Sequence, residues 1–238
     1  MKTVLITGGS RGIGCAMVKL FSEKGYRVAF TYNKSEKEAK DLALSCGALA
    51  IKADSGCERD VISAVETTVR EFGFVDVLIN NAAVSSFSLF TDLTLDDWRK
   101  MFSVNVDGAF LYSREVLKHM IREHKGRIIN ISSMWGEVGS SCEVHYSATK
   151  AALIGMTKAL AKEVGPSGIT VNCIAPGVVD TEMNSAISKE DKDALVSETP
   201  LMCIGKPEDV AEAALFLAGD GSKFITGAVI NVNGGFVM

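Results

Sequence analysis

The sequence predicts a doubly wound α/β fold, in which one sheet of about seven parallel strands carries helices on both faces. Three observations lead to this fold class. Short apolar runs rich in Val and Ile alternate with helical periodicity along the whole chain. No linker, internal repeat or low-complexity segment interrupts this alternation. The 238 residues, 47% of them hydrophobic, suffice for a single domain over residues 1–238.

The expected strands are short apolar runs bounded by residues typical of turns. They lie at residues 2–7, 26–32, 48–52, 75–79, 128–131, 169–174 and 228–232. The expected helices carry apolar residues at helical spacing between these strands. They lie at residues 15–24, 36–46, 59–72, 96–123, 146–162 and 207–217.

Two of these helices and one further segment have features of their own. Pro207 opens the last helix, where the missing N–H of proline does no harm. Asn105 falls inside the fourth helix and is not favoured there by propensity. It therefore indicates either a kink with a buried network or a tolerated surface site. Residues 178–202 are polar with a weak helical pattern, which predicts a lid over a site.

Composition excludes several classes of partner. The net charge is −4 and no basic block occurs, so we expect no nucleic acid partner. No apolar run reaches the ~18 residues of a membrane span, and Met1 leads directly into an apolar strand without a signal-peptide pattern. We therefore expect a cytoplasmic protein. The six cysteines are scattered, without Cys-x-x-Cys pairs or a histidine cluster, so no metal site and no disulfide framework is expected.

A glycine-rich turn, Gly8-Gly9-Ser10-Arg11-Gly12-Ile13-Gly14, stands between the first strand and the first helix. This context is the one that a dinucleotide phosphate site needs. Glycines let the backbone approach the pyrophosphate, and the helix N-terminus offers free N–H groups at its positive dipole end. The turn therefore predicts a nicotinamide dinucleotide site.

The end of the second strand bears on which dinucleotide binds. An NAD site usually places an acid there for the ribose 2′-hydroxyl. Here Asn33, Lys34 and Ser35 follow the strand, and no acid precedes Glu36. With Arg11 in the glycine turn, these donors favour a 2′-phosphate and hence NADP over NAD. In the competing interpretation, Arg11 and Lys34 are surface residues whose charges are solvated.

A candidate reaction centre combines a strand end with the helix that follows it. Ser133 ends the apolar strand at 128–131, and Tyr146 and Lys150 stand four residues apart on one helix face. An ammonium beside a phenol favours the phenolate and lowers the tyrosine pKa, which suits acid catalysis near neutral pH. Alone, this spacing is more often an ordinary exposed helix pair. Asp54, after the third strand, is either a hydrogen-bond partner for adenine or a helix cap.

Together these segments resemble the short-chain dehydrogenase/reductase family over essentially the whole chain, as a Rossmann-type fold. The resemblance rests on the glycine turn with Thr7, on Asn80-Asn81-Ala82, Asn105, Ser133, Tyr146-x-x-x-Lys150 and Pro176-Gly177. It departs from the family at Ala83, where a glycine is usual; we expect a small backbone adjustment there. The resemblance implies an NADP-dependent oxidoreductase that interconverts C=O and CH–OH groups without a metal.

The resemblance also implies the role of each residue. Tyr146 is expected as the general acid, Lys150 as the ligand of the nicotinamide ribose, and Ser133 as the ligand of the substrate carbonyl. Asn105 is expected to hold a water that links Lys150 to solvent. The expected cofactor contacts are Gly8, Ser10, Arg11, Gly12, Ile13, Gly14, Asn33, Lys34, Ser35, Asp54, Asn81, Ala82, Ala83, Tyr146, Lys150, Pro176, Gly177, Val179 and Thr181.

Two substrate interpretations stay open. The chain resembles 3-oxoacyl-acyl-carrier-protein reductases of fatty acid biosynthesis, but His124 and Ser167 stand where arginines near the pocket entrance are expected. The run from Ser132 to Gly136 and the residues before Tyr146 also resemble reductases of the 5-aminopentanone modification on elongation factor P. Glu143 favours that second interpretation, because a carboxylate can pair with a substrate ammonium; otherwise it is a surface or helix N-terminal acid. The expected substrate contacts are Ser133, Met134, Trp135, Glu143 and Tyr146.

Two further expectations concern assembly and catalysis. The apolar patterns over 98–121 and 148–160, with the apolar C-terminal residues 236–238, favour a homotetramer. The alternative to an enzyme is a regulator that binds NADP without catalysing a reaction. It is the least favoured one, because such proteins usually lose the tyrosine or the lysine that this chain keeps.

Overall fold

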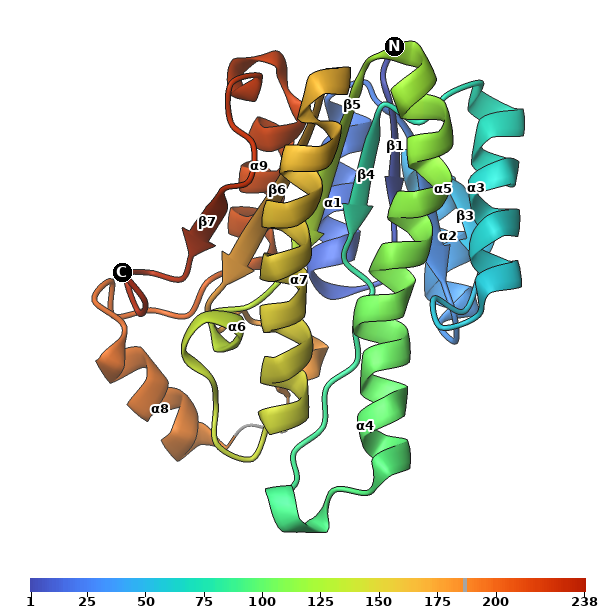
Figure 1. The fold of residues 1–238 in the computed structure, drawn as a ribbon. Helices are drawn as coiled ribbons and strands as arrows, with labels where there is room; N and C mark the ends of the chain where they lie inside the picture. The colour runs from blue at the N-terminus through green and yellow to red at the C-terminus, as the bar shows by residue number, and fades with distance from the viewer. Residues whose placement is uncertain (186–187) are drawn as a thin grey trace.

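The computed structural model describes residues 1–185 and 188–238. Its sheet has seven parallel strands in the order β3-β2-β1-β4-β5-β6-β7 (Figure 1). The chain therefore starts in the middle of the sheet, builds one half outwards, and returns to build the other half. The strands are β1 (Thr3–Ile6), β2 (Arg27–Tyr32), β3 (Leu49–Lys52), β4 (Val77–Asn80), β5 (Gly126–Ile131), β6 (Ile169–Pro176) and β7 (Val229–Val232). This confirms the doubly wound fold that the alternating sequence pattern predicts.

Helices cover both faces because each apolar strand presents side chains to both sides. One face packs against α1 (Gly12–Glu23), α2 (Glu36–Cys46) and α9 (Pro207–Ala218). The other face packs against α3 (Glu58–Phe72), α5 (Gly108–Glu123) and α7 (Val144–Val164). Figure 1 shows α5 and α7 in front of the sheet and α1 behind it. Two apolar cores, one on each face, hold the strand ends in a fixed position.

The long helix expected at 96–123 is interrupted. It consists of α4 (Leu95–Phe102), a π-helical turn η2 (Ser103–Asp107) and α5. Asn105 lies in that turn with an exposed fraction of 1%. Of the two interpretations of Asn105, the kink with a buried network is therefore correct.

Several short elements surround the strand ends. They are α6 (Trp135–Val138), which the sequence did not predict, η1 (Phe90–Asp92), η4 (Glu182–Asn184) and α8 (Lys189–Glu198). The last two fall in the segment 178–202 predicted as a lid, of which residues 186–187 lie outside the described residues. Away from that end lie η3 (Gly165–Ser167) and η5 (Asp220–Ser222). Within the described ranges, no helix is long and apolar enough to span a membrane.

Candidate active site

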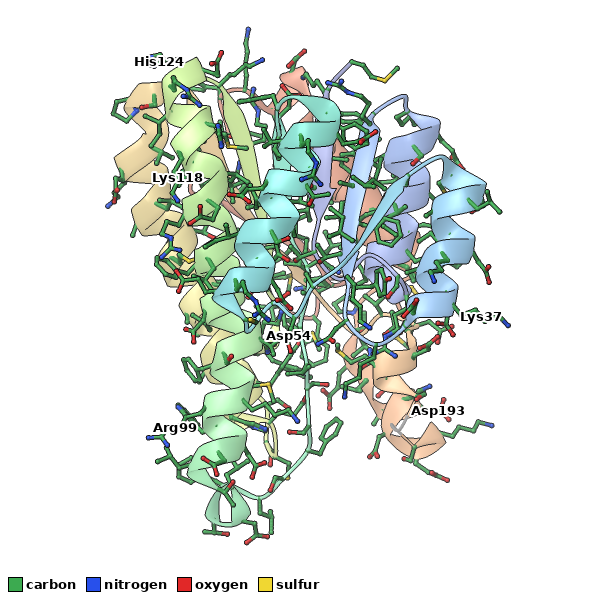
Figure 2. All side chains as sticks on the ribbon, turned by 90° about the vertical axis from the view of Figure 1, so that its right-hand side faces the viewer. Lys37, Asp54, Arg99, Lys118, His124 and Asp193 are labelled. Carbon is green, nitrogen blue, oxygen red and sulfur yellow. The ribbon has the colours of Figure 1, made fainter. Side chains whose placement is uncertain are left out.

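A cleft of about 1090 Å³ opens at the carboxyl ends of the strands. Figure 2 shows Asp54 at this end of the sheet, whereas His124 lies at the opposite end. The helices α4, with Arg99, and α8, with Asp193, both project beyond the strand ends (Figure 2). Open parallel sheets bind their ligands at the carboxyl edge, so this cleft is the candidate active site.

The cleft gathers all the residues that the sequence predicts for a cofactor. They come from the loops after β1 to β4, from α7 and from the segment after β6. They are Gly8, Ser10, Arg11, Gly12, Ile13, Gly14, Asn33, Lys34, Ser35, Asp54, Asn81, Ala82, Ala83, Tyr146, Lys150, Pro176, Gly177, Val179 and Thr181.

The glycine turn brings backbone N–H groups to the cleft. Gly8 has a φ of +65°, a conformation that side chains disfavour. A Cβ on Gly14 would overlap the Gly8 carbonyl oxygen, so only glycine lets α1 begin this close to the turn. Asn81 Nδ2 donates to the carbonyl oxygens of Thr7 (2.9 Å) and Gly8 (3.0 Å) and thereby fixes the turn. The arrangement suits a pyrophosphate at the N-terminus of α1.

The edge beyond β2 is cationic and lacks a free acid among the described residues. Lys34 and Asn33 are exposed and line the cleft. Glu36, the first acid after the strand, is paired with Lys40 (2.7 Å) and Lys52 (3.7 Å). A 2′-phosphate therefore meets donors here and no unpaired carboxylate.

Arg11 has a partner that the sequence did not reveal. Its Nη1 lies 3.3 Å from Glu182 Oε2 on η4, and the two side chains are 65% and 73% exposed. Exposed ion pairs contribute only about 0–1 kcal/mol. Glu182 is thus a weak competitor for the guanidinium, and the pair joins the glycine turn to the segment after β6.

Asp54 shapes the turn before α3. Its Oδ1 accepts the Gly56 N–H at 2.9 Å, and its own N–H donates to Asp60 Oδ2 at 3.2 Å. The N-cap of α3 is Cys57, so the helix-cap interpretation of Asp54 is wrong. The carboxylate lines the cleft with Oδ2 available as an acceptor for an amino group.

Hydrogen bonds from the end of β5 hold α7, which carries Tyr146 and Lys150, in place. Ser132 Oγ donates to the Lys150 carbonyl oxygen at 2.8 Å. In return, Lys150 Nζ donates to the Ile131 carbonyl oxygen at 2.8 Å. Deeper in the core, Asn130 Nδ2 donates to Thr157 Oγ1 at 2.8 Å and ties the same strand to the same helix. Buried polar contacts of this kind fix α7 in one register on β5.

Ser133 and Tyr146 face the same part of the cleft. Ser133 Oγ accepts the Trp135 N–H at 3.2 Å, which leaves its own O–H to donate elsewhere. The two hydroxyls are therefore arranged to share one oxygen atom of a ligand.

The electrostatics of this centre differ from the sequence expectation. Burial, and next the carboxylate of Glu143, raise the pKa of Tyr146 above its ordinary value of 10.0. Burial lowers the pKa of Lys150 from 10.5 to about 8. The expected lowering of the Tyr146 pKa by Lys150 is thus wrong for this arrangement. The ammonium bonds Ile131 and lies 5.4 Å from the centre of the phenol ring.

Asn105 is tied to the protein through its side chain and does not line the cleft. Its Oδ1 accepts the Val84 N–H at 2.8 Å, and its Nδ2 donates to the Val84 carbonyl oxygen at 2.9 Å. The same Nδ2 reaches Thr149 Oγ1 at 3.1 Å, next to Lys150. The amide therefore clamps the loop after β4 to α7. That Asn105 holds a water linking Lys150 to solvent stays a prediction.

Glu143 stands at the mouth of the cleft as a buried carboxylate, 6% exposed. It occupies the N-cap position of α7, but its side chain makes no capping hydrogen bond. It forms no salt bridge within the ranges described, and burial raises its pKa, opposed by a hydrogen bond with Ser140. A charged carboxylate in such a place is costly without a cation. The surface-acid interpretation of Glu143 is therefore wrong.

Three other sequence expectations are corrected. Met134 is 1% exposed and absent from the cleft lining, so it is a core residue and makes no substrate contact, whereas its neighbour Trp135 lines the cleft. His124 ends α5 at the far end of the sheet, and its carbonyl oxygen approaches Gly168, next to Ser167. Neither His124 nor Ser167 lies near the cleft entrance of its own chain.

The structure adds residues that sequence reasoning missed. Phe87 and Ser85, from the loop after β4, line the cleft, as do four residues of α8, Asp191, Ala194, Leu195 and Glu198. Phe87 is 56% exposed. An aromatic residue inside a serine-rich loop was the available signal. The residues of α8 fall in the segment predicted as a lid, but no signal in the sequence indicated which of them line the cleft.

No three His, Cys, Asp or Glu residues gather as a metal site anywhere in the described part of the chain. All six cysteines are free thiols. The polar side chains that line the cleft carry hydroxyls, amides, ammonium groups, carboxylates and the guanidinium of Arg11.

Comparison with known proteins agrees over nearly the full length. The family model described as enoyl-(acyl carrier protein) reductase matches residues 8–237. The 3-oxoacyl-[acyl-carrier-protein] reductase FabG of Staphylococcus aureus is 37% identical over 100% of this chain and 98% of its own length. The protein of that name from Chlamydia trachomatis is 38% identical over 98% of this chain and 96% of its own.

Solved structures show the same likeness. A short-chain dehydrogenase/reductase from Serratia marcescens is 40% identical, with a TM-score of 0.93 over 99% of this chain and 97% of its own. A blue fluorescent protein from a metagenomic library, solved in complex with NADPH, is 37% identical. Its TM-score is 0.94 over 100% of this chain and 98% of its own.

Proposed function

The chain belongs to the short-chain dehydrogenase/reductase family, and on that premise we propose that it reduces ketones with NADPH, using Tyr146 as the general acid. The observation that supports this proposal best is the meeting of Ser133, Tyr146 and Lys150 in one cleft with the glycine turn. The same observation disfavours the non-catalytic regulator, because both hydroxyls and the ammonium are in place.

The residues of the cleft fit NADPH. The close approach at Gly14 leaves the first turn of α1 open to the pyrophosphate, and the cationic edge after β2 suits the 2′-phosphate. Lys150, with an ammonium that bonds only a carbonyl oxygen among the described residues, is the donor for ribose hydroxyls. NADPH when bound supplies the hydride.

The protein's part in the reaction is to hold the carbonyl oxygen and to protonate it. Ser133 and Tyr146 donate hydrogen bonds to that oxygen, where negative charge develops. A raised pKa keeps the Tyr146 phenol protonated at neutral pH, and the growing alkoxide is basic enough to take its proton.

The relatives favour a 3-oxoacyl thioester carried by acyl carrier protein as the substrate, because the 37–38% identical proteins are 3-oxoacyl-[acyl-carrier-protein] reductases. Trp135, Phe87 and Leu195 of α8 line the cleft and offer apolar surface for such a chain. We infer that this thioester is the first substrate to test.

A second substrate class is favoured by Glu143 alone. A buried carboxylate without a cation partner in the described part of the chain lies at the cleft mouth, close enough to influence the Tyr146 pKa. An amino ketone brings an ammonium that would pair with it. The 5-aminopentanone group on elongation factor P is the protein-bound ketone of that kind.

The decisive experiment for the reaction is Tyr146→Phe. We expect kcat for ketone reduction to fall at least about 100-fold, because the proton donor is lost, while the Kd for NADPH changes less than about twofold. Tyr26→Phe is the matched control, since Tyr26 packs edge-on against Phe21 away from the cleft. Activity above a tenth of wild type in Tyr146→Phe would require another acid. His145 is a poor substitute, because it is buried against Ser86 Oγ at 2.8 Å.

We also propose a homotetramer and a lid over residues 178–202. Apolar side chains stay exposed on α5 and near the C-terminus, which supports contacts with other copies. These residues are Phe110, Ile121, Phe224 and Met238. For the lid, the support is that η4 and α8 both contribute residues to the cleft.

A further inference from the structure

The C-terminal tail forms a tight turn beside the cleft. Gly234 and Gly235 adopt φ angles of +66° and +88°, which only glycine adopts readily. Asn233 closes the turn, because its Oδ1 accepts the Gly235 N–H at 3.0 Å and its Nδ2 donates to the Val237 carbonyl oxygen at 3.1 Å. The turn therefore holds Phe236 in a defined position.

Phe236 packs against a wall of the substrate cleft. Its ring meets the indole of Trp135 edge-on, with centroids 5.5 Å apart and an interplanar angle of 90°. Edge-to-face packing is a favoured geometry for aromatic pairs. Trp135 is half-buried, lines the cleft and follows Ser133 by two residues. One side of the indole thus faces the cleft, while Phe236 supports it.

The backbone of α6 cannot move freely with the indole. A Cβ on Gly136 would lie 2.7 Å from the Lys150 carbonyl carbon, so α6 is pressed against α7. Trp135 N–H also bonds Ser133 Oγ. The backbone position of Trp135 is therefore set by α7 and Ser133, whereas the orientation of its side chain depends on Phe236.

The same tail is tied to other walls of the cleft. Gly177 N–H donates to the Val232 carbonyl oxygen at 2.9 Å, just before the turn. Leu201 N–H donates to the Gly234 carbonyl oxygen at 3.1 Å, at the end of the segment predicted as the lid. The turn that carries Phe236 is thereby fixed relative to the cofactor loop and to the residues that follow α8.

We propose that Phe236 is a positioning residue for substrate selection, which acts by holding the Trp135 indole as a wall of the cleft. The inference rests on the proposed function, since Trp135 selects among ketones only if the cleft reduces them. Loss of the Phe236 ring frees the indole to turn. Discrimination between small and bulky ketones then weakens, while proton transfer from Tyr146 and binding of NADPH are retained.

The first test uses fluorescence and needs no catalysis. In a Trp98→Phe background Trp135 is the sole tryptophan. Phe236→Ala is expected to raise the acrylamide quenching constant of Trp135 at least about twofold, because the ring that covers one edge is gone. Phe90→Ala is the matched control, since Phe90 is 64% exposed and is no part of the cleft lining. Phe236→Leu, which keeps apolar volume without a ring, should fall between wild type and Phe236→Ala.

The second test uses kinetics with a series of ketones of increasing bulk. Phe236→Ala should raise KM for small ketones about fivefold, change kcat less than twofold and bring the kcat/KM values of small and bulky ketones closer together. Phe236→Tyr, which keeps the ring, should restore the wild-type ratio. Should Phe236→Ala fail to fold by circular dichroism, Phe236→Leu carries both tests.

The outcomes separate this inference from the proposed function. If the wild-type protein oxidises no NADPH with any ketone, the proposed function is wrong. The quenching result still decides whether Phe236 holds the indole in place. Unchanged quenching in Phe236→Ala, or an unchanged ratio of small to bulky ketones in an active enzyme, overturns the positioning role.

Discussion

Replacing Glu143 by Gln separates the two candidate substrates in one variant. The change keeps the shape of the side chain and removes its charge. Glu143 is 6% exposed and has no cation partner in the described residues, so a substrate ammonium would be its first close counter-ion. Truncating one partner of a buried charge pair costs about 2–5 kcal/mol. A tenfold loss corresponds to ~1.4 kcal/mol and is therefore a conservative threshold.

For an amino ketone, Glu143→Gln should lower kcat/KM at least about tenfold. For a 3-oxoacyl thioester it should have little effect or raise kcat/KM, because repulsion from an acidic carrier protein disappears. The assay follows NADPH oxidation with both substrates side by side. Glu123→Gln, on the exposed end of α5, is the matched control. Unchanged amino-ketone reduction together with robust thioester reduction would exclude the cationic substrate.

The same variant has a stability consequence with a definite sign. Burial raises the pKa of Glu143 in the folded protein, so its charged form is disfavoured relative to the unfolded chain. Wild type therefore loses stability as pH rises through the unfolded and then the folded pKa, and recovers it in acid. Glu143→Gln should accordingly raise Tm at pH 7 and bring no gain at pH 4. A lower Tm at pH 7 would show that the carboxylate has an undetected partner.

Three further predictions concern the cofactor, pH and assembly. Arg11→Ala should raise KM for NADPH about tenfold and leave KM for NADH nearly unchanged, because one charge-assisted phosphate contact is worth about 1.5–3 kcal/mol. Arg99→Ala is the control. Equal effects on both cofactors would contradict the contact between Arg11 and the 2′-phosphate. kcat/KM for NADPH should be constant below pH 7 and fall as pH rises through about 8, since Lys150 is charged only below its lowered pKa. A value of kcat/KM that stays constant up to pH 9.5 would refute the role of the Lys150 charge. Light scattering at micromolar concentration should give the mass of a tetramer, and a mass near 25.4 kDa would exclude it.

Local patterns in the sequence were sufficient for the fold and for most of the cleft. Strand and helix positions follow from short-range periodicity. The residues of the glycine turn can be identified because its close contacts admit only glycine. Once strands alternate with helices, all carboxyl ends meet at one edge, so residues that follow the strands lie together. The assignment of Asn81, Tyr146 and Gly177 to one site came from the family resemblance.

What the sequence could not determine depends on contacts between residues distant in the chain. Asn105 could be buried or exposed until the π-helical turn placed its amide between Val84 and Thr149. Met134 and Trp135 are adjacent and apolar, but one points into the core and the other into the cleft. His124 was assigned to the cleft entrance, although β5 separates it from that edge by the length of the sheet.

The charged residues show most clearly what the sequence determined and what only the tertiary structure decided. From the sequence, Arg11 and Lys150 were expected near the cofactor and Glu143 near the substrate. Only the tertiary structure paired Arg11 with Glu182, left Glu143 buried without a cation among the described residues, and turned Lys150 towards the Ile131 carbonyl oxygen. The reason is physical: local propensity determines where a side chain starts, whereas desolvation and partner geometry depend on every element that packs around it.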